Sequence, residues 1–324
     1  MRPVLLQTEN FSIGSFPCMV TLAMVLVVVT VAVRSARRDL DQRVLVRTMI
    51  ITVLAGWVGG RVLPALAMRG VAGLQWRLLL PTEHVGQSLS AFLLLAFPVA
   101  LVCLVRQRGR MLAYLDAIAP SLLIGVAVAK IGCLLSGCCA GRECPPKWGI
   151  QYPYGSLVYW HQWQSGMIDP PAPLLRTDAE GRDRLLGDGT WLSAQREAPP
   201  PALVEHGQEH GLSVAALLDM VASQRSLPVW PVPVWYIITA SLLWIVAEIV
   251  FRRTRQVGWT MGFVLVAYAA MRLGFDGFVA PTGRLALNPT ISQLNAVAIA
   301  VIGIALLITC LLRRRACPVP AGRR

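Results

Sequence analysis

The sequence predicts an all-α membrane protein with seven transmembrane helices, a small outward-facing head, an outward N-terminus and an inward C-terminus. Three observations predict this fold class. Of the 324 residues, 55% are apolar and 15% are charged, whereas soluble domains carry roughly 25% charged residues. Several apolar stretches reach the roughly 20 residues that cross a bilayer. Basic residues follow alternate stretches. An ordinary soluble enzyme and a disordered chain are both disfavoured.

Seven apolar stretches are predicted to span the membrane. They cover residues 18–33, 49–67, 85–105, 112–136, 232–251, 258–277 and 290–312. The first is short, and Phe16 and Pro17 can extend it. Its positive charges follow the apolar run instead of preceding it, so we do not expect a cleaved signal peptide.

Arginine clusters predict the orientation of these spans. A net charge of +13 would suggest a nucleic-acid partner if the protein were soluble. The clusters instead follow the first, third, fifth and seventh stretches. They comprise Arg34, Arg37, Arg38, Arg43 and Arg47, then Arg106, Arg108 and Arg110, then Arg252, Arg253 and Arg255, then Arg313, Arg314 and Arg315. By the positive-inside rule these clusters are cytoplasmic, so no nucleic-acid partner is expected.

Residues 140–231 interrupt the apolar pattern because they are rich in proline and charged in the middle. The predicted organisation is therefore spans one to four in 1–139, a head in 140–231, and spans five to seven with a basic cytoplasmic tail in 232–324. A short helix is expected at about 211–223. Aromatic residues favour membrane interfaces, so the aromatic start of the head is predicted to lie on the lipid surface. Its members are Trp148, Tyr152, Tyr154, Tyr159, Trp160 and Trp163.

Ionisable side chains inside the spans are costly and are therefore functional candidates. Lys130 lies inside the fourth span, where snorkelling and a counter-ion role for a phosphate or carboxylate are equally supported. Arg272 and Asp276 are four residues apart on the sixth span, so they share a helix face. They form either a structural ion pair or, as we favour, part of a cavity for an anionic ligand.

Three further candidates lie near span ends. His84 could act as a general base, although taken alone an interfacial histidine is the simpler interpretation. Arg61 follows two glycines, and snorkelling is slightly favoured for it. Asp116 lies in the first turn of its helix, where the helix dipole explains an acid. If Arg61, Lys130 and Arg272 converge, a lipid phosphate is the simplest ligand.

Four thiols lie close together at the end of the fourth span. They belong to Cys133, Cys138, Cys139 and Cys144. Their spacing does not match a zinc knuckle, so close helix packing, with an outer-side disulfide as an option, is favoured and no metal is predicted. A nucleophilic Cys138 or Cys139 is the alternative, since a neighbouring cation lowers a thiol pKa.

His206 and His210 have the i, i+4 spacing of a helical metal pair. Gly207 weakens the helix between them, and no third ligand is obvious. We predict a solvated segment here.

Short motifs follow one another in order from Phe11 to Gly303. They are Phe11-Ser12-Ile13-Gly14, Gly59-Gly60-Arg61, His84-Val85-Gly86, Asp116, Lys130 to Arg142, Trp148-Gly149-Ile150, Tyr268 with Arg272, and Gln293. The stretch from Lys130 to Arg142 is similar to the signature Arg-Ile-Gly-Asn-Phe-x-Asn-Gly-Glu-x-x-Gly-Arg. In order and spacing, this set resembles the prolipoprotein diacylglyceryl transferase family.

The resemblance implies a multi-pass enzyme of the bacterial inner (plasma) membrane that needs no cofactor. It would move the diacylglyceryl group of phosphatidylglycerol onto the lipobox cysteine thiol of a prolipoprotein signal peptide, and glycerol phosphate would leave. The catalytic residues it implies are His84, Arg272, Lys130 and Asp116. The substrate-binding residues it implies are Arg61, Asp276, Gln293, Gly141, Arg142, Cys133 and Cys138.

These residues suggest a division of roles. Arg61, Lys130 and Arg272 would hold the lipid phosphate and stabilise the leaving glycerol phosphate. His84 would take the proton from the acceptor thiol, because the thiolate is the attacking species. The remaining polar groups, Asp116, Asp276 and Gln293, would orient these side chains.

The chain also departs from the family pattern. Lys130 replaces the signature arginine, Cys133 its asparagine and Cys138 its glutamate. Lysine keeps the charge but loses the bidentate fork, and Cys138 loses an acid. The chain more closely resembles a divergent branch with Gly-Cys-Cys in the signature. Two alternatives stay open: a related lipid transferase with another acceptor, and a catalytically degenerate paralogue that binds phospholipid or a lipoprotein.

Overall fold

The computed structural model describes residues 4–8, 11–69, 89–106, 110–177, 181–187, 199–254, 256–279 and 291–316 of the chain. The chain divides into two compact units. The first comprises Met1–Val25, Leu123–Val246 and Val264–Ile304, and the second comprises Leu26–Leu122, Ala247–Phe263 and Ala305–Arg324. Each unit is described by itself.

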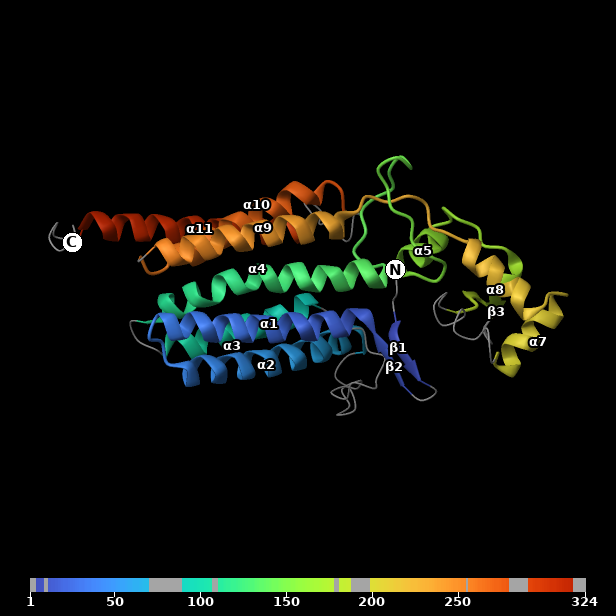
Figure 1. Ribbon diagram of the computed structural model, residues 1–324, viewed down its shortest axis with the longest axis horizontal. Helices are drawn as coiled ribbons and strands as arrows, with labels where there is room; N and C mark the ends of the chain where they lie inside the picture. The colour runs from blue at the N-terminus through green and yellow to red at the C-terminus, as the bar shows by residue number, and fades with distance from the viewer. Residues whose placement is uncertain are drawn as a thin grey trace. The chain divides into compact units, whose positions relative to one another are not determined.

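A helix occupies each predicted span where the structure describes it (Figure 1). These helices are α1 (Ser15–Arg37), α2 (Gln42–Arg69), α3 (Leu89–Val105), α4 (Met111–Ser136), α9 (Val232–Arg253), α10 (Trp259–Asp276) and α11 (Ile291–Ala316). Among the described residues, five helices, α1, α2, α4, α9 and α11, have the length and apolar composition that a membrane crossing requires. The mostly helical, membrane-type fold is confirmed, while seven crossings and their orientation stay predictions.

The apolar core of the first unit joins α4, α9 and α10. It contains Ala127, Val232, Tyr236, Ala240 and Met271. Alanine has a small side chain, so helix backbones can approach closely at such positions, as they do in membrane helix bundles. This packing places polar side chains of α4 and α10 beside the same stretch of α9.

The second unit is held together by an apolar core and by buried arginines. The core contains Val31, Leu40, Leu45, Leu104, Tyr114, Ala117 and Phe251. Arg34 is 3% exposed, and its Nε donates to Glu248 Oε2 over 2.7 Å. Arg38 donates to the carbonyl oxygens of Phe251 and Thr254 over 2.7 and 2.8 Å. Two arginines that the sequence analysis treated as topology signals therefore also stabilise this unit.

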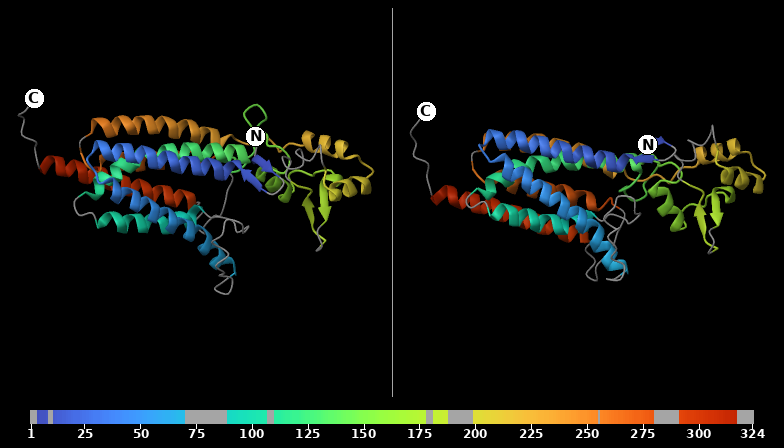
Figure 2. Two further views of the ribbon diagram at one scale, coloured as in Figure 1. Left: turned by 60° about the horizontal axis from the view of Figure 1, so that its bottom comes forward. Right: turned by 90° about the horizontal axis from the view of Figure 1, so that it is seen from below.

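Residues between α4 and α9 contribute short elements to the first unit. These are α5 (Leu157–Gln164), η3 (Ala172–Leu174), β3 (Leu175–Thr177), β4 (Asp183–Leu185), α7 (Pro201–Glu209) and α8 (Val214–Ser223). Strands β3 and β4 pair antiparallel with Arg176 opposite Arg184, as the hairpin in Figure 2 shows. The helix expected at about 211–223 is confirmed as α8. The β3–β4 hairpin and a second one, β1 (Val4–Thr8) with β2 (Phe11–Gly14), were not predicted.

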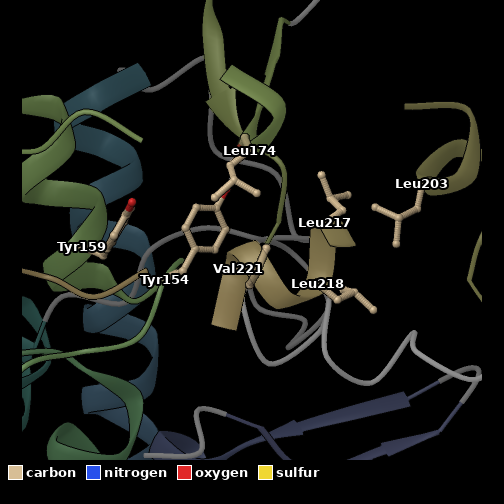
Figure 3. Packing of buried hydrophobic residues seen from close by; sticks show 7 residues of the cluster. All are labelled: Tyr154, Tyr159, Leu174, Leu203, Leu217, Leu218 and Val221. Atoms are coloured by element: carbon tan, nitrogen blue, oxygen red, sulfur yellow. The ribbon is translucent and has the colours of Figure 1, made fainter. Parts of the chain in front are cut away.

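A separate hydrophobic core holds these short elements together (Figure 3). Its buried residues are Tyr154, Tyr159, Leu174, Leu203, Leu217, Leu218 and Val221. The Tyr154 hydroxyl donates to the Leu174 carbonyl over 2.6 Å and accepts from the Leu186 amide over 3.1 Å. Because the phenols find partners inside the protein, the rings can be buried.

The prediction that the aromatic start of this region lies on the lipid surface is wrong for three of its members. Tyr152, Tyr154 and Tyr159 are at most 1% exposed. In contrast, Trp148 is 62% exposed and Trp160 is 36% exposed. Aromatic composition alone does not separate the two cases, because a tyrosine ring can pack inside the protein as well as at a membrane interface.

The histidine pair also differs from its prediction. His206 lies on α7 and is buried, and its Nε2 is 2.9 Å from the Pro173 carbonyl oxygen. The ring centroids of His206 and His210 lie 4.6 Å apart. Gly207 lies inside α7 and does not break the helix. A Cβ at this position would lie 2.9 Å from the Leu212 carbonyl oxygen, so a residue without a side chain fits best there.

Candidate functional site

The thiols of Cys133, Cys138 and Cys139 meet at the end of α4. The helix ends at Ser136, Gly137 follows with φ +70°, and the Cys138 amide donates to the Cys133 carbonyl over 3.0 Å. This bond and a left-handed glycine define a Schellman cap, which turns the chain back along the last helical turn. The three sulfur atoms consequently lie within 4.8 Å of one another.

These three cysteines and Cys144 are not joined in disulfides, so the option of an outer-side disulfide is not realised. The Ser136 hydroxyl lies 3.3 Å from Cys138 Sγ. Hydrogen bonds from the Cys133 and Cys138 thiols, with a smaller contribution from Lys130, lower the pKa of Cys139 below its ordinary value. Thiols up to six residues apart along the chain thus form one cluster.

Lys130 and Arg272 come together around one tyrosine. Lys130 Nζ lies 4.8 Å from the ring centroid of Tyr236, and the Arg272 guanidinium acts electrostatically on the Tyr236 hydroxyl. Tyr236 is 3% exposed. Two cations in a poorly solvated environment repel each other and attract an anion strongly. Lys130 and Arg272 thus both act on Tyr236 within the first unit, while their predicted convergence on an anionic ligand stays a prediction.

Asp276 and Gln293 connect α10 with α11. Gln293 Nε2 donates to Asp276 Oδ2 over 2.6 Å. Asp276 lies one helical turn after Arg272 on α10. The sequence analysis placed both Asp276 and Gln293 among the residues that orient the phosphate-binding side chains, and the structure brings the two together.

Gly141 and Arg142 lie where three segments of the first unit cross. The Gly141 amide donates to the Trp230 carbonyl over 3.0 Å, and the Arg142 amide donates to the Phe278 carbonyl over 2.8 Å. Arg142 Nε also donates to the Val279 carbonyl over 3.1 Å. A Cβ on Gly141 would lie 2.6 Å from the Phe278 oxygen, so this close approach requires glycine. The predicted substrate-binding pair therefore has a structural function at this junction.

Asp116 belongs to the second unit and is 1% exposed. Its Oδ2 accepts from the Gly258 amide over 2.6 Å and its Oδ1 accepts from the Met261 amide over 2.8 Å. The carboxylate thus binds amides at the N-terminus of α10, where unsatisfied donors and the helix dipole favour an acid. These contacts account for its burial without the catalytic role that the resemblance implied.

Arg61 also belongs to the second unit. It is 4% exposed, and its guanidinium carbon lies 4.6 Å from the Trp57 ring centroid. Burial on this scale does not support the snorkelling interpretation, which needs the charged group at an interface. His84 lies outside the described residues. Convergence of Arg61 and His84 with Lys130 and Arg272 stays a prediction.

Sequence reasoning missed Tyr236 and gave no role to Tyr152. Tyr236 is the one tyrosine of α9 and lies in the apolar first turns of that helix, and its hydroxyl there was the available signal. Tyr152 is 0% exposed, and the Cys138, Cys139 and Cys133 thiols act electrostatically on its hydroxyl. No sequence pattern links Tyr152 to the thiols, because the turn after α4 creates their proximity.

Comparison with known proteins agrees with the resemblance seen in the sequence. The family model described as prolipoprotein diacylglyceryl transferase matches residues 3–309. A protein of Clostridium perfringens named phosphatidylglycerol–prolipoprotein diacylglyceryl transferase 2 is 27% identical over 166 residues, which cover 49% of this chain and 62% of that protein. A Clostridium tetani protein named phosphatidylglycerol–prolipoprotein diacylglyceryl transferase is 23% identical over 159 residues, which cover 47% of this chain and 61% of that protein.

The matched part is thus less than two thirds of each clostridial relative. The family model, in contrast, extends over nearly all of this chain and includes α1 to α10 and the thiol cluster. The chain belongs to the prolipoprotein diacylglyceryl transferase family.

Proposed function

We propose that this protein transfers the diacylglyceryl group of phosphatidylglycerol to the lipobox cysteine thiol of a prolipoprotein, as a multi-pass protein of the bacterial inner membrane. Family membership supports a transferase. The observation that carries the choice of an anionic lipid is the pairing of Lys130 and Arg272 around Tyr236. Two cations sharing one buried phenol have the chemistry to bind a phosphate.

In the proposed reaction, a bond forms between the acceptor sulfur and the glyceryl carbon that carries the phosphate. The bond between that carbon and the phosphate oxygen breaks, and glycerol phosphate leaves with the electron pair. Lys130 and Arg272 stabilise the negative charge that develops on the leaving group, with Arg61 as a third proposed cation. His84 is the proposed acceptor of the thiol proton, because the thiolate is the nucleophile.

In the proposed mechanism, other residues position the phosphate-binding side chains and the segments that carry them. Tyr236 holds the two cations at a fixed separation. Gln293 and Asp276 tie α11 to the end of α10, one turn from Arg272. Gly141 and Arg142 hold the chain after the thiol cluster against the ends of α9 and α10. Cys133, at a signature position, lies one turn after Lys130 on α4 and borders it, while Cys138, at another signature position, lies in the cap that follows the helix.

The membrane arrangement is part of the proposal. All seven apolar helices cross the bilayer, with the N-terminus outside and the arginine clusters in the cytoplasm. Residues 140–231 then lie outside, where a secreted prolipoprotein first exposes its signal peptide. Residues 1–139 and 232–324 supply the transmembrane part.

A complementation experiment tests the proposed function. The wild-type gene is expressed in a bacterial strain depleted of its own transferase, and mass spectrometry measures the diacylglyceryl thioether on a reporter lipoprotein. We expect modification to be restored by wild type and lost in Arg272→Ala. Arg253→Ala, an exposed arginine at the end of α9, is the matched control and retains activity. Failure of expressed wild type to modify the reporter, with phosphatidylglycerol still bound, identifies a degenerate paralogue instead.

A second test uses Lys130, which stands where the family signature has an arginine. Lys130→Arg restores the residue of the family signature and adds a bidentate donor, so it should match or exceed wild type in the same assay. Lys130→Gln keeps the length and removes the charge, so it should lose most of the activity. Equal activity of both variants contradicts a phosphate-binding role for Lys130.

An enzyme-bound intermediate on Cys138 or Cys139 is a different mechanism with the same lipid. A thioether formed there is a poor leaving group, so further transfer from it is chemically unfavourable. Mass spectrometry of the purified protein distinguishes the mechanisms, because direct transfer leaves these cysteines unmodified and the alternative adds a glyceryl adduct.

A further inference from the structure

We propose that Cys133, Cys138 and Cys139 form a binding site for one soft d10 metal cation, of the zinc or cadmium class. The three sulfur atoms come from two adjacent segments, the last turn of α4 and the cap that follows it, and lie within 4.8 Å of one another. This differs from the expectation of no metal, which rested on spacing along the chain. The inference is independent of the proposed transferase function.

The geometry of the thiols fits such a cation with a small contraction. A Zn–S bond is about 2.3 Å long, so a tetrahedral site separates its sulfur atoms by about 3.8 Å. The thiols therefore need to move toward one another by at most about 1 Å. Cys139 lies in the cap after α4 at φ +58° and is exposed, so its side chain has room to make this adjustment and the site can be reached from outside.

The charge around the three thiols also favours the binding of a metal cation. Three thiolates with one divalent cation carry a net charge of −1, and burying that charge is costly unless it is paired. Lys130 interacts with both Cys139 and Cys133, so its ammonium group can neutralise the complex. Thiolates, rather than carboxylates, select soft cations such as zinc over magnesium or calcium.

Tyr152 provides an independent observation that points to a ligand here. Its side chain is 0% exposed, and its hydroxyl has no hydrogen-bond partner among the described residues. Its ring packs on Gly137, the residue that turns the chain, since a Cβ there would lie 3.0 Å from Tyr152 Cδ1. A buried unsatisfied hydroxyl needs an explanation. A metal-bound thiolate would accept its hydrogen bond, as groups outside the ligand set do in known metal sites.

Metal binding to the purified, full-length protein in detergent tests the proposal. The protein is kept reduced with a phosphine, stripped with a chelator, incubated with Zn²⁺ or Cd²⁺ and desalted, and the retained metal is measured by mass spectrometry. We expect one ion per chain in wild type and in Cys103→Ser, a cysteine on α3. Cys139→Ser and Cys138→Ser should retain none. Tyr152→Phe should weaken the affinity by about 10- to 100-fold.

A second measurement needs no variant, so misfolding cannot affect it. Wild-type protein is alkylated with a maleimide, with and without Cd²⁺, and the modified peptides are identified. Protection of Cys133, Cys138 and Cys139 but not of Cys103 supports the site. Absence of stoichiometric metal in folded wild type, metal retention unchanged in Cys139→Ser, or equal alkylation with and without Cd²⁺ overturns it. These readouts do not involve lipid transfer, so failure here leaves the proposed function untouched.

Discussion

The Lys130 ammonium nitrogen lies 4.8 Å from the ring centroid of Tyr236, and Arg272 acts electrostatically on the hydroxyl of the same tyrosine. One phenol thus interacts with a cation from α4 through its ring and with a cation from α10 through its polar end. The face of an aromatic ring attracts cations because of its quadrupole. Because the ring interacts favourably with Lys130, two like charges can lie near each other, and a bound anion would balance them.

Removing only the Tyr236 hydroxyl distinguishes the interaction of Tyr236 with Lys130 from its interaction with Arg272. Tyr236→Phe keeps the ring under Lys130 and removes the hydroxyl on which Arg272 acts. The loss of one polar interaction costs about 1 kcal/mol, so kcat/KM for phosphatidylglycerol should fall roughly fivefold in the purified transferase assay.

Tyr236→Leu removes the ring as well and should reduce kcat/KM further. Circular dichroism of both variants checks that the helices are retained. Wild-type kinetics in Tyr236→Phe contradict the positioning role of the hydroxyl.

Replacing Asp116 tests whether this residue is structural or catalytic. Both of its oxygens accept backbone hydrogen bonds at the start of α10, so Asp116→Ala removes both acceptors. The loss of a helix cap of this kind costs about 0.5–2 kcal/mol, and unsatisfied amides add to that cost. Thermal unfolding in detergent should show a lower Tm, with transferase activity retained below it. An unchanged Tm together with complete loss of activity assigns Asp116 to catalysis instead.

The ion pair of buried Arg34 with partly buried Glu248 should contribute to stability. Glu248 Oε2 accepts from Arg34 Nε, and Glu248 Oε1 accepts from Arg252 Nε over 2.8 Å. Glu248→Gln leaves the charge of Arg34 buried without its carboxylate. The cost should be below the about 3–5 kcal/mol of a fully buried pair, because Glu248 is partly solvated, and we expect a measurable fall in Tm.

The double variant Arg34→Met with Glu248→Gln removes both charges and should regain much of the loss. A double-mutant cycle on the four Tm values measures the coupling. Additive effects of the two substitutions argue against a direct interaction.

Gly141 should not tolerate a side chain. A Cβ would lie 2.6 Å from both the Phe278 oxygen and Trp230 Cβ, and overpacking costs about 1–3 kcal/mol. Gly141→Ala should therefore lower the Tm.

Gly277→Ala is the matched control, because a Cβ at Gly277 meets nothing within 4 Å. Exposed substitutions of this kind change stability by about 0.5 kcal/mol or less. Equal Tm values for the two alanine variants contradict the close approach at Gly141.

The helices, their apolar character, the family and the two cations Lys130 and Arg272 could all be recognised from residue order alone. A long apolar run can only satisfy its backbone inside lipid as a helix, and a charge within such a run stands out. These properties depend on residues that are close together along the chain, so they can be predicted from the sequence.

Which side chains meet could not be predicted from the sequence and follows from the packing of the helices. Tyr236 interacts with both cations because α4, α9 and α10 share a core, and the three thiols meet because Gly137 reverses the chain after α4. Tyr152, Tyr154 and Tyr159 are buried instead of lying on the lipid surface. The physical reason is that proximity between segments depends on packing and cap geometry, which residue type and spacing do not specify.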